Sequence, residues 1–142
     1  MANQPIGRQS FMFENPPIIN YWASVAGKKE MEGPLGKYFD YTHSDTYFGQ
    51  KTWEQGEKRM QQLALETLAQ KAGMRIHDLE LVLSGDLLNQ CIGSSFTLRN
   101  TGVPHIGLYG ACSTMAESLM LASMVVGGGF RHHAVAMTSS HF

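Results

Sequence analysis

Short apolar segments alternate along the chain with longer segments of helical periodicity, and this alternation predicts an α/β protein. Apolar runs bounded by turn residues are typical of buried strands, and here they cover residues 10–13, 79–84, 104–109 and 134–138. Apolar positions spaced three and four residues apart indicate helices at residues 52–72, 87–99 and 113–126. This order of strands and helices implies a mostly parallel sheet with right-handed crossovers.

The helix predicted at residues 52–72 has the clearest signals. Thr52 and Gln55 have capping-box spacing, and Gly73 supplies a C-terminal stop. The apolar stripe consists of Trp53, Met60, Ala64, Leu65, Leu68 and Ala72. The charged residues that fall largely off this stripe are Glu54, Glu57, Lys58 and Arg59. We therefore expect an amphipathic helix in an outer layer, with its charges away from the buried face.

The segment before this helix has weaker signals. Residues 1–9 are polar, and we expect them to be flexible. Residues 18–22 resume an extended, apolar course after the break at Asn15-Pro16-Pro17. Residues 26–45 are predicted to form one long loop, and loops of that length are usually functional or docked on a partner. The polar and aromatic residues in or beside that loop, such as His43 and Asp45, are more simply interpreted as solvated.

The helix predicted at residues 113–126 has almost no polar face, since Glu117 is its only charge. A helix that is apolar on all sides is buried on all sides, whereas one sheet covers only one of them. We therefore expect a second half of the fold, or a partner chain, to cover the rest. The sequence also ends at Phe142, just after a predicted strand and turn, so we expect the fold to be truncated.

Composition narrows the range of functions. A formal net charge of −1 gives no reason to expect nucleic acid as a partner. The two cysteines, Cys91 and Cys112, form no disulfide framework, which favours a reducing compartment. The sequence shows no signal peptide and no apolar run long enough to span a bilayer, so any membrane role would be peripheral.

The stretch from His105 to Met115 contains the strongest candidate chemistry. It is predicted as a strand, a turn of small residues and a helix start, with Cys112 at that start. Unpaired main-chain N–H groups at a helix N-terminus stabilise an anion and lower the pKa of a thiol. Gly110 keeps the turn narrow and can adopt a positive φ. The pattern indicates a nucleophile or an anion pocket, although a small buried cysteine beginning a core helix is equally compatible with it.

Asp86 is a second candidate because it follows a predicted strand at Gly85-Asp86, and ligands of α/β sheets bind beyond the carboxyl ends of strands. Asp86 could instead cap the next helix, and the two roles can coexist. The residues expected on the buried side of that helix are Leu88, Cys91, Ile92 and Phe96. His132 and His133 have no convincing metal-ligand spacing with His141, and we interpret them as a solvated loop pair.

Several motifs together resemble the thiolase-like superfamily, and within it the stage V sporulation protein AD family. Gly110-Ala111-Cys112-Ser113-Thr114 after a strand is shared by many condensing enzymes. The far more specific runs are Gly85-Asp86-Leu87-Leu88-Asn89-Gln90 and Thr138-Ser139-Ser140-His141, and Gly33-Pro34-Leu35-Gly36 and Gln50-Lys51-x-Trp53-Glu54 add to the resemblance. The resemblance covers the chain from about Phe11 onward.

The resemblance implies a five-layered α/β/α/β/α fold of two similar halves, of which residues 1–142 are the N-terminal half-domain. The apolar helix would then lie in the central layer, and the strand at residues 105–109 would be a sheet edge that pairs in a homodimer. In thiolase-like enzymes the central cysteine carries an acyl group, and residues of the second half activate it. An acyl-transferring condensing enzyme that uses Cys112 is therefore the alternative function.

For the sporulation family the resemblance implies binding of dipicolinic acid, free or as its calcium chelate, without catalysis. It implies a peripheral place at the spore inner membrane, among the other proteins of a channel system that acts in sporulation and germination. Cys112 and Asp86 map onto the family's pocket, with His141 as a weaker candidate, and neither a cofactor nor a resident metal is expected. A dianion would tolerate Asp86 only if that side chain is protonated, bridges through calcium, or orients a donor.

Overall fold

The computed structural model describes residues 3–88 and 90–141, and its centre is a parallel sheet of three strands in the order β6-β5-β7. These strands are β5 (Val82–Asp86), β6 (His105–Gly107) and β7 (Val135–Ser139). Expectations that concerned Met1, Ala2, Asn89 and Phe142 lie outside the described residues. The predicted α/β class with a parallel sheet is confirmed, and so is the place of β6 at a sheet edge.

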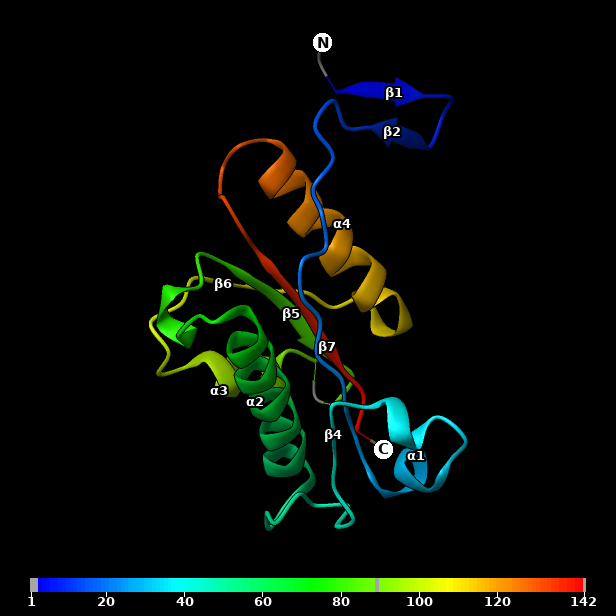
Figure 1. Ribbon diagram of the computed structural model, residues 1–142, viewed down its shortest axis with the longest axis vertical. Coiled ribbons are helices and arrows are strands. Elements are labelled where there is room, and N and C mark those ends of the chain that lie inside the picture. Colours follow the sequence, from blue (N-terminus) through cyan, green and yellow to red (C-terminus); the bar gives the residue numbers. More distant parts are fainter. Residues whose placement is uncertain (1–2, 89, 142) are drawn as a thin grey trace.

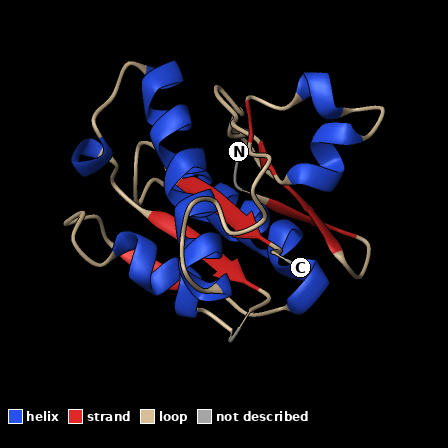
Figure 2. Cartoon of the chain, turned by 90° about the horizontal axis from the view of Figure 1, so that it is seen from below, coloured by secondary structure: helices blue, strands red, loops and turns tan. Residues whose placement is uncertain are grey.

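Helices cover both faces of this sheet, as the views along two directions show (Figures 1 and 2). On one face, α2 (Trp53–Ala72) and α3 (Ile92–Leu98) enclose a core that includes Val82 of β5. On the other face, α4 (Thr114–Gly127) packs over Leu83 of the same strand. Successive residues of a strand point to opposite faces, so β5 serves two cores at once. The resulting α/β/α arrangement is compatible with one half of a thiolase-like fold.

The ends of α2 are set by local signals that the sequence predicts correctly. The Thr52 hydroxyl accepts a hydrogen bond from the Gln55 amide at 3.3 Å, and Gly73 ends the helix with a φ of 65°. The buried face differs from the predicted stripe, because Glu57 and Gln61 are fully buried on it beside Leu65. The expectation that Glu57 falls off the buried face is therefore wrong.

The buried side of α3 is also different from the predicted one. The helix begins at Ile92 rather than near residue 87, and the side chains of Ile92 and Phe96 are 41% and 51% exposed. The residues that it buries are Gly93, Ser94, Thr97 and Leu98. Small and hydroxyl-bearing residues face inward here because α3 packs closely against polar groups of α2 and β5, described below.

The N-terminal segment has more regular structure than expected. Residues predicted to be flexible include β1 (Gln4–Ile6), which pairs antiparallel with β2 (Ser10–Met12). Residues 18–22 run without regular structure, and the predicted long loop contains two strands and two helical segments. These elements are β3 (Val25–Ala26), α1 (Lys28–Glu32), the 3₁₀ turn η1 (Gly36–Tyr38) and β4 (Tyr41–Thr42), with β3 and β4 paired in parallel.

The helix α4 is covered by the sheet on one side only. It buries Thr114, Ser118 and Ala122, while its opposite side exposes several apolar side chains. Those exposed side chains are Met115, Leu119, Met120 and Met124, and together we call them the outer face of α4. The prediction that one sheet leaves part of this apolar helix uncovered is confirmed. Among the described residues, no helix combines the length and the apolarity needed to cross a membrane.

Candidate functional site

Cys112 lies in a 3₁₀ turn, η3 (Ala111–Ser113), between β6 and the start of α4. Its side chain is exposed, which agrees with an accessible thiol rather than with a buried core cysteine. The turn is held by the Ser113 hydroxyl, which donates to the Gly110 carbonyl at 2.6 Å, and by the Gly110 amide, which donates to the Thr114 hydroxyl at 3.1 Å. These bonds fix the backbone that carries the thiol.

The residue of this turn with a positive φ is Ala111, not Gly110. Gly110 has a φ of −116°, so it does not use the positive φ that is open to glycine. Ala111 has a φ of 49°, in the left-handed region that residues with a Cβ rarely adopt. A Cβ on Gly110 would approach the Ser113 hydroxyl and the Glu117 carboxylate, so glycine is needed there for space.

The start of α4 has the polarity that favours an anion. Its N-cap residue, Ser113, makes no side-chain hydrogen bond to the first turn of the helix. The Ser113 and Thr114 amides are already used, by the Gly110 and Ala111 carbonyls, so only later amides of the first turn are left for water or a ligand. The helix dipole adds positive potential there. Glu117 lies in the same turn and opposes this effect with its own negative charge.

Asp86 ends β5 and is buried, with 1% of its surface exposed. Its Oδ2 atom accepts hydrogen bonds from the Ser94 amide at 2.9 Å and from the Ser94 hydroxyl at 2.8 Å. Ser94 is the third residue of α3, so Asp86 satisfies a free amide at the start of that helix. Asp86 thereby caps α3 as predicted, although it precedes Ser94 by eight residues and is not the N-cap residue itself.

Asp86 at the carboxyl end of β5 and Cys112 in the turn after β6 belong to different surroundings. Asp86 bonds to α3, on the side that α2 and α3 cover. A Cβ on the preceding residue, Gly85, would collide with the Leu108 carbonyl oxygen and approach Thr114, the first residue of α4. Asp86 and the start of α4 therefore lie on opposite sides of β5.

His141 follows β7 and is buried between two aromatic rings. Its ring centroid is 4.8 Å from that of Trp53 and 5.8 Å from that of Phe48. Burial lowers the pKa of this imidazole, and its Nε2 atom has no hydrogen-bond partner. His141 lies beside the first turns of α2, because a Cβ on Gly56 would be 3.3 Å from that nitrogen.

Glu57 is the functional candidate that the sequence analysis missed. Its Oε1 atom accepts a hydrogen bond from the Ser139 hydroxyl at 2.7 Å. Burial, above all, raises the pKa of this carboxyl to about 7, and the neighbouring charge of Asp86 adds to the rise. The helical spacing of Glu57, Gln61 and Leu65 was the available signal, since residues four apart share a face of a helix.

Gln61 links Glu57 to Asp86. Its side-chain amide donates to the Ser139 hydroxyl at 2.7 Å and to the Ser94 hydroxyl at 3.2 Å. Because Ser139 contacts Glu57 and Ser94 contacts Asp86, one chain of hydrogen bonds joins the two carboxyl groups. We call these five residues, Glu57, Gln61, Asp86, Ser94 and Ser139, the polar cluster. It brings Asp86 close to the residues around His141, and it does not include Cys112.

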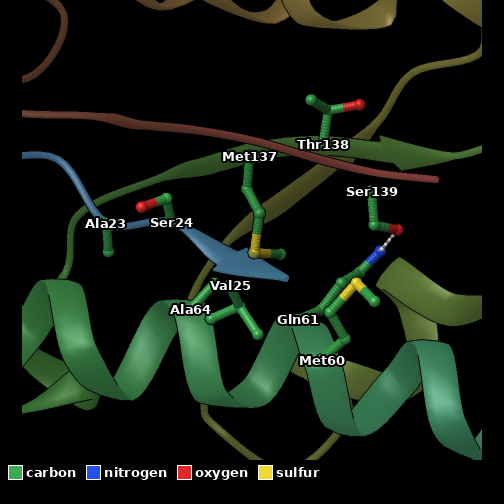
Figure 3. Close-up of a pocket in the computed structure, with 9 residues that line it drawn as sticks. All are labelled: Ala23, Ser24, Val25, Met60, Gln61, Ala64, Met137, Thr138 and Ser139. Carbon is green, nitrogen blue, oxygen red and sulfur yellow. Dashed lines mark hydrogen bonds between the residues drawn. The ribbon is translucent and has the colours of Figure 1, made fainter. Parts of the chain in front are cut away.

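A cavity of about 160 Å³ opens beside the polar cluster (Figure 3). Gln61 and Ser139 form its polar end, and the figure shows the bond between their side chains. The other lining residues are Ala23, Ser24, Val25, Met60, Ala64, Met137 and Thr138. A second cavity, of about 340 Å³, lies between the β1–β2 hairpin and α4 and is lined by Phe11, Phe13 and Met124 among others. Cys112 lines neither of them.

The remaining histidine pair contacts a carboxylate. The Glu80 side chain accepts hydrogen bonds from the His132 amide at 2.8 Å and pairs with the His132 ring at 3.1 Å, while His133 Nε2 accepts from the Glu80 amide. Within residues 3–88 and 90–141, no three His, Cys, Asp or Glu side chains gather in a way that could hold a metal ion.

Comparisons with known proteins place this geometry in context. Residues 7–142 match the family described as Stage V sporulation protein AD (SpoVAD). The chain is 40% identical over 135 residues to Stage V sporulation protein AD of Bacillus subtilis (strain 168). That similarity covers 95% of this chain and 40% of the relative, so the chain spans about 40% of the length of the curated relative it matches.

Proposed function

Because the chain belongs to the stage V sporulation protein AD family, we propose that it binds dipicolinic acid, free or as its calcium chelate, as a non-catalytic component. Family membership supports a sporulation-related role. Our proposal adds the ligand and a part in moving it into the forming spore and out again at germination. In this proposal the chain contributes one half of a thiolase-like fold.

The observation that supports the proposal most is the turn that leads into α4. There an exposed thiol, Cys112, precedes a helix whose N-cap makes no side-chain bond to the first turn. A carboxylate of dipicolinate would accept hydrogen bonds from those main-chain N–H groups, as anions do at helix N-termini. Met115, exposed in the first turn of α4, offers an adaptable apolar contact to the pyridine ring.

Asp86 and His141 are assigned supporting roles on the other side of β5. The two bonds from Ser94 to Asp86 favour the donor-orienting role, because the carboxylate fixes both a hydroxyl and the first turn of α3. His141 stays a candidate because its Nε2 atom is buried without a hydrogen-bond partner. Asp86 is thus proposed as a positioning residue rather than as a direct contact of the dianion.

The assembly is also part of the proposal. We infer a peripheral position at the spore inner membrane, beside the other proteins of the channel system, and a homodimer that pairs the free edge of β6. The edge position of β6 supports the dimer, because an unpaired strand edge offers N–H and C=O groups to a second copy. Nucleic acid is not proposed as a partner.

Titration with dipicolinate, with and without calcium, tests this function. The protein would be compared with C112A, D86A and C91A, where C91A serves as the matched cysteine control. We expect C112A to weaken binding about fivefold, roughly 1 kcal/mol, through a changed pocket shape. D86A should weaken it more, because Ser94 and α3 lose their acceptor, while C91A should bind like wild type.

Three outcomes would count against the proposal. If C112A and D86A both bind like wild type, the ligand binds elsewhere. If isophthalate, which has the same carboxyl spacing without the ring nitrogen, binds as tightly as dipicolinate, the site is a general anion site. If the protein ignores dipicolinate and becomes acylated at Cys112 by an acyl-coenzyme A, the condensing-enzyme alternative holds.

A further inference from the structure

The polar cluster contains two buried carboxyl groups and a hydrogen-bond chain with a fixed direction. The Gln61 amide nitrogen donates one hydrogen to Ser139 and the other to Ser94. Each serine hydroxyl then donates its only hydrogen to a carboxyl oxygen, Ser139 to Glu57 and Ser94 to Asp86. The side-chain N–H and O–H hydrogens of Gln61, Ser94 and Ser139 are therefore all donated within the polar cluster.

Three oxygen atoms of the same cluster remain without a partner. They are Glu57 Oε2, Gln61 Oε1 and Asp86 Oδ1, all of them buried. All three are acceptors, so none can satisfy another unless one of them carries a hydrogen. Leaving a buried acceptor unpaired is costly, and leaving a buried carboxylate uncompensated costs more.

The Asp86 carboxyl and the Glu57 side chain both lie against Gly93 of α3. The place where a Cβ on Gly93 would stand is 3.3 Å from the Asp86 carboxyl carbon and 3.5 Å from the Glu57 Cγ methylene. Two ionised carboxylates in such proximity repel each other, and a shared proton relieves that repulsion. The absent side chain of Gly93 leaves the space that the pair needs.

The titratable groups that face Glu57 do not supply a positive charge. β5 contributes Asp86, and the segment after β7 contributes His141. α3, β3 and β7 themselves contain no titratable side chain. Across the described part of the chain, the ion pairs include neither Glu57 nor Asp86. A buried, neutral His141 adds no charge.

We propose that Glu57 and Asp86 form a buried carboxyl pair that holds one proton, that Glu57 is its protonated member, and that this proton governs how well the site accepts a dianion. The protonated Glu57 gains an O–H group, which can satisfy one of the unpaired acceptors. Asp86 is the member to which the Ser94 amide and hydroxyl both donate. The raised pKa of Glu57, about 7, agrees with this distribution.

The consequence for the ligand depends on the function proposed above. With one proton present, the cluster has one negative charge rather than two, so it repels dipicolinate less. Loss of the proton as the pH rises through about 7 would add a second negative charge beneath the strand ends. The proposed site would then bind dipicolinate more tightly on the acidic side of neutrality than on the alkaline side.

The first test needs no ligand. The infrared C=O band of a protonated carboxyl is recorded for wild type and for Glu57→Gln from about pH 5 to about pH 8. We expect a band in wild type that persists near neutrality, fades as the pH rises, and is absent from Glu57→Gln. Asp86→Asn removes the neighbouring charge and should move the loss of this band to lower pH. If wild type and Glu57→Gln have the same band near pH 6, the pair does not exist.

Unfolding by urea gives an independent measurement with a definite sign. A carboxyl whose folded pKa is raised stabilises the folded state fully below its unfolded value, and this stability is lost as the pH rises through the folded value. The urea concentration at the unfolding midpoint of wild type should therefore decrease as the pH is raised from about 5 to about 8. That of Glu57→Gln should change little over the same range. His141 has the opposite effect on the pH dependence of stability. Its pKa is lowered in the folded state, so its contribution destabilises the protein as the pH falls, not as it rises.

The final measurement links the pair to the ligand. Dipicolinate affinity of wild type should fall at least about threefold between pH 6 and pH 8, and that of Glu57→Gln should change little. An affinity of wild type that is level with pH, together with the infrared band, would show that the proton exists but does not govern the site. Absence of dipicolinate binding at every pH contradicts the proposed function, whereas the infrared and urea results still judge the carboxyl pair.

Discussion

Ser139 donates its hydroxyl hydrogen to Glu57 across 2.7 Å, although 82 positions separate the two residues in the chain. The bond joins the carboxyl end of β7 to the first half of α2 and opens the chain of contacts that reaches Asp86. It therefore fixes how α2 lies on the sheet, and it keeps one oxygen of a buried carboxyl satisfied.

Removal of this hydroxyl should destabilise the protein. In Ser139→Ala, both Glu57 and the Gln61 amide lose a partner while they stay buried, which costs about 1–3 kcal/mol. Loss of a bond that lowers the pKa of Glu57 should also move its titration to higher pH. Urea unfolding measures both effects. Thr138→Val is the control, because Thr138 is exposed on the same strand, and an equal loss there would refute a specific role for the bond.

Gly93→Ala should destabilise the protein although alanine favours helices. In an ordinary helix the change gains about 1 kcal/mol. Here the new methyl group would be 3.3 Å from Asp86, which cannot retreat without loss of its bonds to Ser94. We expect a net loss of about 1 kcal/mol, since overpacking typically costs 1–3 kcal/mol. Ser95→Ala, on the exposed side of α3, should be neutral or stabilising, and a stabilised Gly93→Ala would contradict the close packing.

The two cysteines should differ in reactivity. Cys112 is exposed, whereas Cys91 is partly buried and its thiol donates to the Leu108 carbonyl at 3.1 Å. Burial raises the pKa of Cys91, and the charges of Asp86 and Glu117 raise it further, so less of it is thiolate near neutrality. Alkylation by iodoacetamide, followed by mass spectrometry, should modify Cys112 first. Equal rates at the two positions would show that the assigned environments are wrong.

The outer face of α4 should drive association. Its exposed methionine and leucine side chains form an apolar surface of the kind that marks an interaction site. Leu119→Glu and Met120→Glu should reduce the apparent mass in light scattering and weaken binding of an apolar dye without loss of the fold. Ala122→Glu, on the buried side of the same helix, should instead unfold it. A monodisperse, monomeric wild type that binds no dye would overturn this expectation.

Much of the fold could be predicted because its signals are local. Thr52 and Gly73 mark the ends of α2 by capping chemistry that depends only on neighbouring residues. The strand at Val135–Ser139 lies within one residue of its predicted bounds, since its apolar run is flanked by clear turn residues. The apolar composition of α4 likewise indicated, without any partner in view, that one sheet leaves part of it uncovered.

The polar cluster could not be predicted, because it depends on residues far apart in the sequence. Glu57 is flanked by Lys58 and Arg59, so local pattern places it among solvated charges. Its burial follows from the position of Ser139, which only the assembled sheet brings near. A contact between distant elements also explains why α3 buries a different face from the predicted one. Ser94 faces inward and bonds to Asp86, and the larger Ile92 and Phe96 are left exposed.

The central claim is that dipicolinate binds where η3 leads into α4, and mapping of amide chemical shifts by NMR tests it most directly. Addition of dipicolinate to the ¹⁵N-labelled protein should shift the amide signals of residues 110–115 most. Smaller changes should reach Ser94 through Asp86, and isophthalate should leave most signals in place. If the largest shifts instead fall on residues that line the cavity beside Gln61, or if no signal moves, the account of this site is wrong.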